Sequence, residues 1–198
     1  MAESIIQITA GSGTKLHSFQ RTIGANIVED EVQIPGEPYL AGYTGSYSGQ
    51  GIGTSAAHLF QLMAGSSLKV KVHRIEISQN ALAGSASTLG FEILRLSTAG
   101  TGGTSATPSP HDPSDSASGA TMMALPSSKG TEGVRLWAGT MPIAAAQPGG
   151  NRWVWDAQGW VKPFYIAAGT SNGICFKITT GIASATCAVD VTFTESNF

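Results

Sequence analysis

The sequence contains few charged residues. Lys, Arg, Asp and Glu make up 12% of its 198 residues, about half of the roughly 25% found in ordinary soluble domains. Small polar residues take their place, since Ser (22), Thr (19) and Gly (25) together form a third of the chain. At 41% hydrophobic residues the chain can still bury a core, which excludes overall disorder. The composition therefore predicts a folded domain with a polar but nearly uncharged surface.

Basic residues are sparse and scattered. The 11 Lys and Arg are outnumbered by 13 Asp and Glu, for a net charge of −2. Nucleic-acid binding requires a basic patch or stripe. Lys69, Lys71, His73 and Arg74 form the one cluster, and their alternation with apolar residues indicates the outer face of a strand. We expect no nucleic-acid partner.

Long apolar runs are missing. The start of the chain has no positively charged segment followed by an apolar run, so we expect no signal peptide and synthesis in the cytoplasm. No stretch approaches the ~18 apolar residues of a membrane span. We expect no membrane partner.

Cysteine is also rare. Cys175 and Cys187 fall in two strand-like stretches joined by a hairpin-sized link at residues 181–185. A hairpin centred on Ala183 would place Cys187 opposite Thr179, so the two sulfurs would not be cross-strand neighbours. We predict two free thiols, buried as small apolar groups.

Helical periodicity is nearly absent. Residues 54–64 could place Ala57, Leu59, Phe60 and Met63 on one helix face, but the same stretch could be a strand. Strand patterns dominate elsewhere, at residues 4–9, 26–34, 68–77, 91–96, 133–137, 153–155, 164–168, 174–178 and 187–193.

One strand has a slip in its pattern. Leu68, Val70 and Val72 keep one parity, and Ile75 and Ile77 continue in the other. A one-residue slip in a two-residue period predicts a β-bulge at residues 73–74. Two separate strands are the alternative.

Nine or ten short strands separated by turn residues predict an all-β fold, an antiparallel β-sandwich of jelly-roll type with little helix. Residues 1–24 are expected to form an N-terminal strand or arm, and residues 25–198 a single sandwich domain. Two segments rich in Gly, Ser, Tyr or Pro, 39–53 and 98–119, are expected to be long loops.

The middle of the chain carries a family resemblance. Residues 64–77, which contain Leu68-Lys69-Val70-Lys71-Val72-His73-Arg74-Ile75-Glu76-Ile77, are followed by Leu94-Arg95-Leu96 and by a Pro-rich loop running through Pro108, Pro110, His111 and Asp112. Over residues 60–125 this pattern resembles virion structural proteins of tailed bacteriophages, of the jelly-roll decoration, head-fibre or accessory type.

The resemblance implies a non-enzymatic capsid decoration or accessory subunit. Its partners would be the major capsid protein or other virion proteins, at the capsid, neck or tail. It also implies localisation in the virion and a closed homo-oligomer, with a trimer expected. A carbohydrate- or receptor-binding β-sandwich module is the alternative, and a small β-sandwich hydrolase ranks third.

Nucleophile and phosphate motifs are not found. Residues 45–49 (GSYSG) hold Gly and Ser at the wrong spacing for a nucleophile elbow. The glycines at 100, 102, 103, 149 and 150 precede no Gly-Lys-Ser/Thr. We therefore predict no catalytic residue and no cofactor-binding residue.

The histidines lack metal-ligand spacing. His17, His58, His73 and His111 do not pair with another His or Cys as zinc ligands would. His17 and His73 are expected on the surface or rim, and His58 against the core or an interface. His111, Asp112 and Asp115 could hold a metal, but Asp-Pro and Ser-Asp favour a turn. We predict no metal site.

The acidic run Glu29, Asp30 and Glu31, followed by Glu37, is interpreted as a solvated face or a guard on an edge strand. A glycosidase needs two carboxylates facing each other in a cleft, and adjacency in sequence does not supply that.

Aromatic residues gather late in the chain. Trp137, Trp153, Trp155 and Trp160 fall within 24 positions, with Phe164 and Tyr165 close behind. Core or subunit-interface packing is the favoured interpretation, because aromatics are abundant in both. A stacking platform for sugars or a receptor is the alternative.

Overall fold

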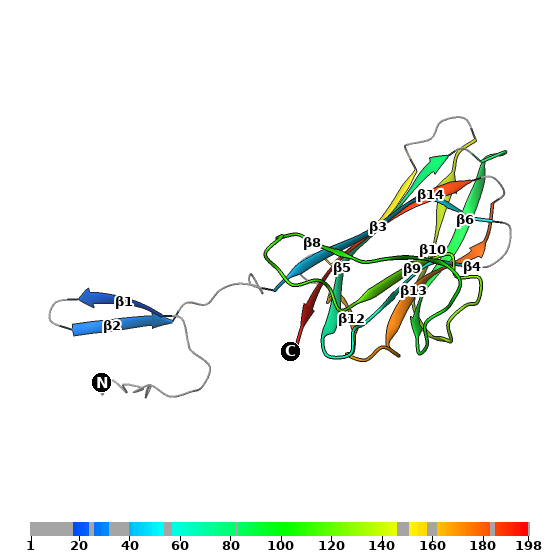
Figure 1. Ribbon diagram of the computed structural model, residues 1–198. Coiled ribbons are helices and arrows are strands. Elements are labelled where there is room, and N and C mark those ends of the chain that lie inside the picture. Colours follow the sequence, from blue (N-terminus) through cyan, green and yellow to red (C-terminus); the bar gives the residue numbers. More distant parts are fainter. Residues whose placement is uncertain are drawn as a thin grey trace. The chain divides into compact units, whose positions relative to one another are not determined.

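The structure is a computed structural model, and it describes residues 18–23, 26–31, 40–53, 57–81, 83–145, 151–157, 162–182 and 185–197 (Figure 1). The chain divides into two compact units, Met1–Tyr39 and Leu40–Phe198. The sequence had placed this boundary after Gly24.

The smaller unit contains a two-stranded antiparallel sheet of its own. Strand β1 (Ser18–Ile23) pairs with β2 (Asn26–Glu31), from Ser18 opposite Glu31 to Ile23 opposite Asn26. The acidic residues Glu29 and Glu31 therefore lie on a strand that pairs with β1. The predicted strand at residues 4–9 lies outside the described residues.

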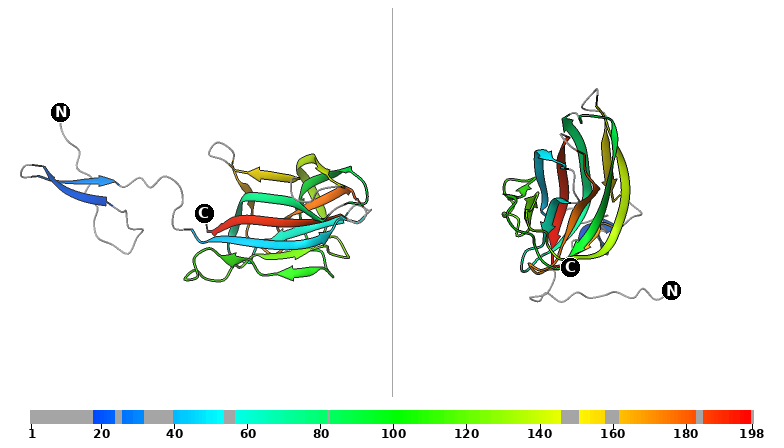
Figure 2. Two further views of the ribbon diagram at one scale, coloured as in Figure 1. Left: turned by 90° about the horizontal axis from the view of Figure 1, so that it is seen from above. Right: turned by 90° about the vertical axis from the view of Figure 1, so that its right-hand side faces the viewer.

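The larger unit is a sandwich of two antiparallel sheets, which Figure 2 shows as two layers. Sheet I has the order β11-β5-β14-β3-β8, with β12 also paired to β5. Sheet II has the order β10-β6-β13-β4-β9-β7. The strands are β3 (Gly42–Gly51), β4 (Ala57–Met63), β5 (Lys69–Ala81), β6 (Ser87–Leu96), β7 (Thr104–Ala106), β8 (Ser109–Pro110), β9 (Thr121–Ala124), β10 (Glu132–Ile143), β11 (Arg152–Asp156), β12 (Phe164–Ile166), β13 (Gly173–Thr180) and β14 (Thr186–Ser196).

Every regular element of the described residues is a strand, and the predicted all-β antiparallel sandwich is confirmed. The core lies between the two sheets, because alternate residues of each strand point into the gap. In β14 the residues Cys187, Val189, Val191 and Phe193 are all fully buried, as their alternation predicted.

Strand β5 contains the predicted bulge. Phe193 of β14 lies opposite Val72, and its neighbour Thr192 lies opposite Arg74, so His73 is the extra residue. The strand runs unbroken from Lys69 to Ala81, and the alternative of two separate strands is wrong. The bulge keeps both Val72 and Ile75 in the core although their parity differs.

The predicted hairpin between residues 174–178 and 187–193 is wrong. Strand β13 lies between β6 and β4 in sheet II, and β14 lies between β5 and β3 in sheet I. The short link therefore crosses from one layer to the other. Both faces of β13 are apolar and buried at Ile174 and Cys175, which suits a strand in the middle of a covered sheet.

The predicted long loop at residues 39–53 is also wrong over most of its length, because β3 occupies Gly42–Gly51. Tyr43 and Tyr47 point into the core, and the Tyr43 ring stacks on Phe193 at 5.5 Å. Gly45 lies between them, where a Cβ would come within 1.9 Å of Sδ of Met122. Packing between the sheets thus holds a glycine-rich segment as a strand.

The helix considered for residues 54–64 is not present at Ala57–Met63, which form β4 instead. Of the long loop expected at residues 98–119, short stretches form β7 and β8. The rest is tied to the sandwich, since the Glu195 carboxylate, at 5% exposed, accepts hydrogen bonds from the Ser118 hydroxyl and the Ala120 amide at 2.9 and 2.8 Å.

Candidate functional site

The tryptophans extend the core toward the open edges of the sheets. Trp137 on β10 stacks on Phe91 at a centroid distance of 5.5 Å, and Trp153 on β11 meets Phe91 edge-on at 4.8 Å. Trp155 stacks on Phe164 at 3.9 Å. All three indole rings pack against buried core residues or residues in contact with them.

One edge of sheet II carries two exposed apolar side chains. Strand β10 ends the sheet and pairs with β6 alone among the described strands. Its Val134 is 74% exposed and its Trp137 is 36% exposed. Val134 and Trp137 are thus large apolar side chains left exposed on an edge strand.

A polar cluster lies on the outer face of sheet II, the face turned away from the core. His58 on β4 is fully buried, and its Nε2 lies 3.0 Å from Oε1 of Glu132 on β10. The Nζ of Lys177 on β13 donates to Oε2 of Glu132 at 2.6 Å. The His58 cluster consists of His58, Glu132, Lys177 and Gln61, the last on β4.

Two segments, 97–103 and 125–131, lie beside this cluster, since Gly100 approaches Gln61, Pro126 and Ser128. They pair with each other through Thr101 and Ser128. The Gly100 amide donates to Oε1 of Gln61 at 2.7 Å, and Nε2 of Gln61 lies 2.7 Å from Nδ1 of His58. The cluster therefore ties these segments to β4, β10 and β13.

Burial and the hydrogen bonds within the cluster shift the pKa values of His58, Glu132 and Lys177. Burial lowers the pKa of His58 below its ordinary value, against the opposing effect of the Glu132 carboxylate. Burial alone would raise the pKa of Glu132, but the hydrogen bonds from Lys177 and His58 outweigh it and lower that pKa. The hydrogen bond to Glu132 raises the pKa of Lys177.

A buried imidazole beside a carboxylate is half of a general-base arrangement. Here both ring nitrogens of His58 are occupied, one by Glu132 and the other by Gln61. The nearby Cys175 is fully buried, and burial raises the pKa of its thiol to about 12. The arrangement acts as a link between elements, with no free nitrogen to accept a substrate proton.

Sequence reasoning found part of this cluster. It placed His58 against the core or an interface, and the structure buries it completely. It missed Gln61, Glu132 and Lys177 as partners. The available signal was the pair of polar residues, His58 and Gln61, within an otherwise apolar stretch from Ala57 to Met63.

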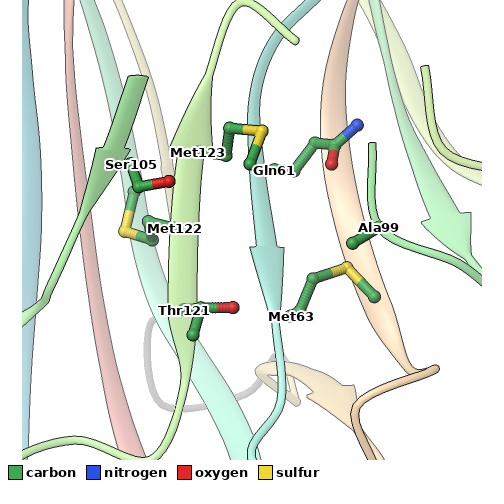
Figure 3. Close-up of a pocket in the computed structure, with 7 residues that line it drawn as sticks. All are labelled: Gln61, Met63, Ala99, Ser105, Thr121, Met122 and Met123. Carbon is green, nitrogen blue, oxygen red and sulfur yellow. The ribbon is translucent and has the colours of Figure 1, made fainter. Parts of the chain in front are cut away.

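A shallow cavity of about 230 Å³ adjoins the cluster (Figure 3). It lies on the outer face of sheet II between β4, β9 and the segment containing Ala99. Its described lining residues are uncharged: Gln61, Met63, Ala99, Ser105, Thr121, Met122 and Met123.

The loop at residues 111–115 forms a turn. The Asp112 carboxylate accepts hydrogen bonds from the Ser114 amide at 2.8 Å and hydroxyl at 2.7 Å, which lower its pKa. His111 bonds through Nε2 to the Thr44 hydroxyl at 2.6 Å. Over the described residues, no group of three or more His, Cys, Asp or Glu side chains could hold a metal ion.

The basic cluster on β5 lies on the outer face of sheet I. Its Arg74 pairs with Glu76 at 2.6 Å and with Asp156 at 3.8 Å. His73 bonds to the Thr194 hydroxyl at 2.9 Å. Carboxylates thus accompany this patch, as expected for an ordinary strand face.

The remaining candidates do not assemble into a site. Ser46, in the stretch considered for a nucleophile, donates to Asp190 at 2.5 Å on the outer face of sheet I. Gly100, Gly102 and Gly103 belong to a segment that lies beside the His58 cluster. Several candidates lie outside the described residues: His17, Glu37, Gly149, Gly150 and Trp160.

The two cysteines are free and buried. Cys175 packs on the outer face of sheet II with Met63, Leu94 and Leu96, and Cys187 packs in the core. Burial raises the pKa of each thiol to about 12. The predicted free thiols agree with the structure, although the hairpin used to predict them does not exist.

Within the described part of the chain, no helix has the length and apolar character needed to cross a bilayer. Comparison with protein-family models, with curated proteins and with solved structures finds no match to this chain.

Proposed function

We propose that this chain is a non-enzymatic structural subunit of a tailed-bacteriophage virion. In this proposal a jelly-roll sandwich assembles as a homo-oligomer and binds the capsid, neck or tail lattice, most simply as a capsid decoration subunit.

The order of the strands is the observation that carries the proposal. Eight strands form two sets of four, β3-β14-β5-β11 and β4-β13-β6-β10, and the first four of them alternate between the sheets. The last two, β13 and β14, insert between the first four, with β13 between β4 and β6 and β14 between β3 and β5. Two Greek keys wound in this manner are expected of a jelly roll, an architecture of many viral capsid proteins.

Strands β7, β8 and β9 are an insertion between β6 and β10. They extend the edges that lie away from β10 and β11. In sheet I β8 pairs with β3, and in sheet II β9 pairs with β4 and β7 with β9. The insertion covers two sheet edges, whereas the edge at β10 keeps its exposed Val134 and Trp137. This contrast supports β10 as the surface through which subunits meet.

The polar groups also support a structural role. Both nitrogens of the buried His58 are occupied, and Cys175 is held as a neutral thiol. A lattice-binding subunit needs rigid, satisfied polar clusters and an exposed docking edge, and it needs no reactive group.

Two measurements test the proposal. Light scattering on a size-exclusion column should give a mass that is a multiple of 20.4 kDa, with a trimer expected. Mass spectrometry of purified phage particles should detect the chain at a fixed ratio to the major capsid protein. A monomer would overturn the homo-oligomer, and particles that lack the chain would overturn the virion role.

A carbohydrate- or receptor-binding module is the second candidate, favoured by the exposed ring of Trp137. Jelly rolls also serve as lectin domains. A glycan bound there should change the tryptophan fluorescence, and Trp137→Phe should abolish the change while Trp153 and Trp155 remain. No fluorescence response across a glycan panel would remove this candidate.

A further inference from the structure

Arg95 lies at a position of β6 where the alternation of the strand predicts an inward-facing apolar residue. Along β6, Leu89, Phe91 and Ile93 point into the core and are almost completely buried. Arg95 continues the same parity and lies opposite Ile174, which is fully buried. The last inward position of this strand is therefore a half-buried guanidinium at the end of the sandwich.

This charge has no counter-ion among the described residues. The other arginines whose side chains the structure describes, Arg74, Arg135 and Arg152, each pair with a glutamate at 2.6–3.0 Å. Arg95 instead donates from Nη1 to the backbone carbonyl of Tyr165 in sheet I. Burial lowers its pKa, and no carboxylate offsets that effect. A partly desolvated charge without an opposite charge is costly and is usually matched by a partner.

The guanidinium lines a cavity of about 340 Å³. The lining is Arg95, Leu96, Tyr165, Ile166, Ala167, Asn172 and Gly173, and Arg95 is the one charged residue among them. The Asn172 amide nitrogen is used by the Ala168 carbonyl at 2.8 Å. A guanidinium carries five N–H donors, and the Tyr165 carbonyl accounts for one interaction.

We propose that Arg95 anchors a binding site for a carboxylate group at this end of the sandwich. A single cationic group matches a monoanion, whereas a phosphate dianion would keep unmatched negative charge in the cavity. The planar fork of a guanidinium fits the two oxygens of a carboxylate. The apolar walls at Leu96, Ile166 and Ala167 suit the carbon body that carries it.

The carboxylate can belong to a free small molecule, such as a uronic acid, or to a glutamate side chain of another protein. The site does not depend on the proposed virion role, since its chemistry follows from the unpaired charge and the cavity. The choice of probes separates the two sources.

The experiment is an NMR titration of the ¹⁵N-labelled full chain. The signals followed are the backbone amides of residues 166–168 and 172–173 and the Arg95 side chain. The probes are sodium acetate, sodium glucuronate and a capped Gly-Glu-Gly peptide. Glucose, a capped Gly-Gln-Gly peptide and sodium chloride at equal ionic strength are the neutral and ionic controls.

We expect saturable shifts with acetate and with glucuronate, the Glu peptide or both, and none with the controls. Saturation by glucuronate alone identifies a free small molecule, and saturation by the Glu peptide alone identifies a protein side chain. Arg95→Gln should abolish the shifts. Arg95→Lys, which keeps the charge without the fork, should weaken binding roughly tenfold.

Arg135→Gln is the matched control, because Arg135 is 61% exposed and its side chain pairs with Glu92. It should bind the probes like the unchanged chain. If no carboxylate saturates the unchanged chain, or if Arg95→Gln still shows the shifts, the proposal is wrong and Arg95 only bridges the two sheets. Should Arg95→Gln fail to fold, Arg95→Ala replaces it as the variant that must lose the shifts, and unchanged binding in Arg95→Lys would overturn the role of the guanidinium fork.

Discussion

Gln61 donates a hydrogen bond from its amide nitrogen to Nδ1 of His58 over 2.7 Å. The orientation of that amide follows from its other end, where Oε1 accepts the Gly100 amide at 2.7 Å. Nδ1 is then an acceptor, so the ring proton resides on Nε2 and is donated to Glu132. The protein holds His58 as one neutral tautomer, and a second proton on the ring would face the Gln61 NH₂ group.

This arrangement predicts a loss of stability on acidification. Burial lowers the pKa of His58 from its ordinary value of 6.5 in the folded chain. Below about pH 6.5 the unfolded chain therefore binds a proton that the folded chain does not. The free energy of unfolding should fall as pH falls below that value, and His58 should contribute no pH dependence above it. Urea unfolding at about pH 7.5 and about pH 5.5 measures the effect.

His58→Gln provides the test of assignment. It should cost about 1–3 kcal/mol near neutral pH, because Glu132 and Gln61 lose a buried partner. It should also reduce the pH dependence below 6.5. His111→Gln, at an exposed histidine bonded to Thr44, should leave that dependence intact. An unchanged pH dependence in His58→Gln would contradict the tautomer argument.

A second prediction concerns the segments that lie beside the His58 cluster. A Cβ at Gly130 would lie 2.1 Å from the backbone carbonyl oxygen of Thr98, which cannot rotate away. Gly130→Ala should separate the two segments and lower the free energy of unfolding by about 1–3 kcal/mol. Hydrogen exchange at the Gly100 amide should accelerate, because that amide bonds to Gln61.

Gly51→Ala is the matched control for this substitution. A Cβ there meets nothing within 4 Å, and its φ is not among the positive values. The free energy of unfolding of Gly51→Ala, and hydrogen exchange at its Gly100 amide, should match those of the unchanged chain. If Gly130→Ala behaves like Gly51→Ala, the close approach of the two segments is not a constraint on the fold.

Local periodicity explains which parts of the fold were predictable. The alternation of Cys187 to Phe193 and the slip at His73 are properties of single strands, and both are present. The sheet that a strand joins depends on distant partners, so the assignment of 174–178 and 187–193 to one hairpin failed. Strand β3 was missed because its glycines have low strand propensity, which tertiary packing of Tyr43 and Met122 overrides.

In the candidate sites, too, local features could be predicted from the sequence and contacts between distant residues could not. His58 was expected against the core or an interface, and it stands in an apolar stretch. Its partner Glu132 is 74 positions away, and no spacing rule connects them. The sequence analysis placed Arg95 in a strand and in the resemblance pattern, but not in a site. An inward-facing charge becomes evident only when the opposite residue, Ile174, is known to be buried.

A third prediction tests the edge of sheet II as the contact between subunits. Val134→Lys places a charge on the unpaired strand β10, a change that prevents edge-to-edge association. The oligomer should dissociate to monomers on size-exclusion chromatography with light scattering. Stability of the monomer fold should change by no more than about 0.5 kcal/mol, because the side chain is 74% exposed.

Ser109→Lys on the edge strand β8 of sheet I is the control for Val134→Lys, since it adds the same charge at an exposed position on a different edge. It should keep the mass of the unchanged chain. Should Val134→Lys keep that mass as well, the subunits meet through another surface and β10 is not the contact.

The last prediction concerns the thiols. Cys175 and Cys187 are fully buried in different sheets, and burial raises each pKa to about 12. At about pH 8 the thiolate fraction is negligible, and neither sulfur is accessible. A maleimide should therefore leave the folded chain unlabelled without reductant and add two labels after unfolding, as intact-mass analysis would show. Cys175→Ser and Cys187→Ser should each lose one label.

No labelling after unfolding would reveal a disulfide, which two strands in separate layers do not allow without rearrangement. Rapid labelling of Cys175 alone in the folded chain would show that its packing with Met63, Leu94 and Leu96 opens.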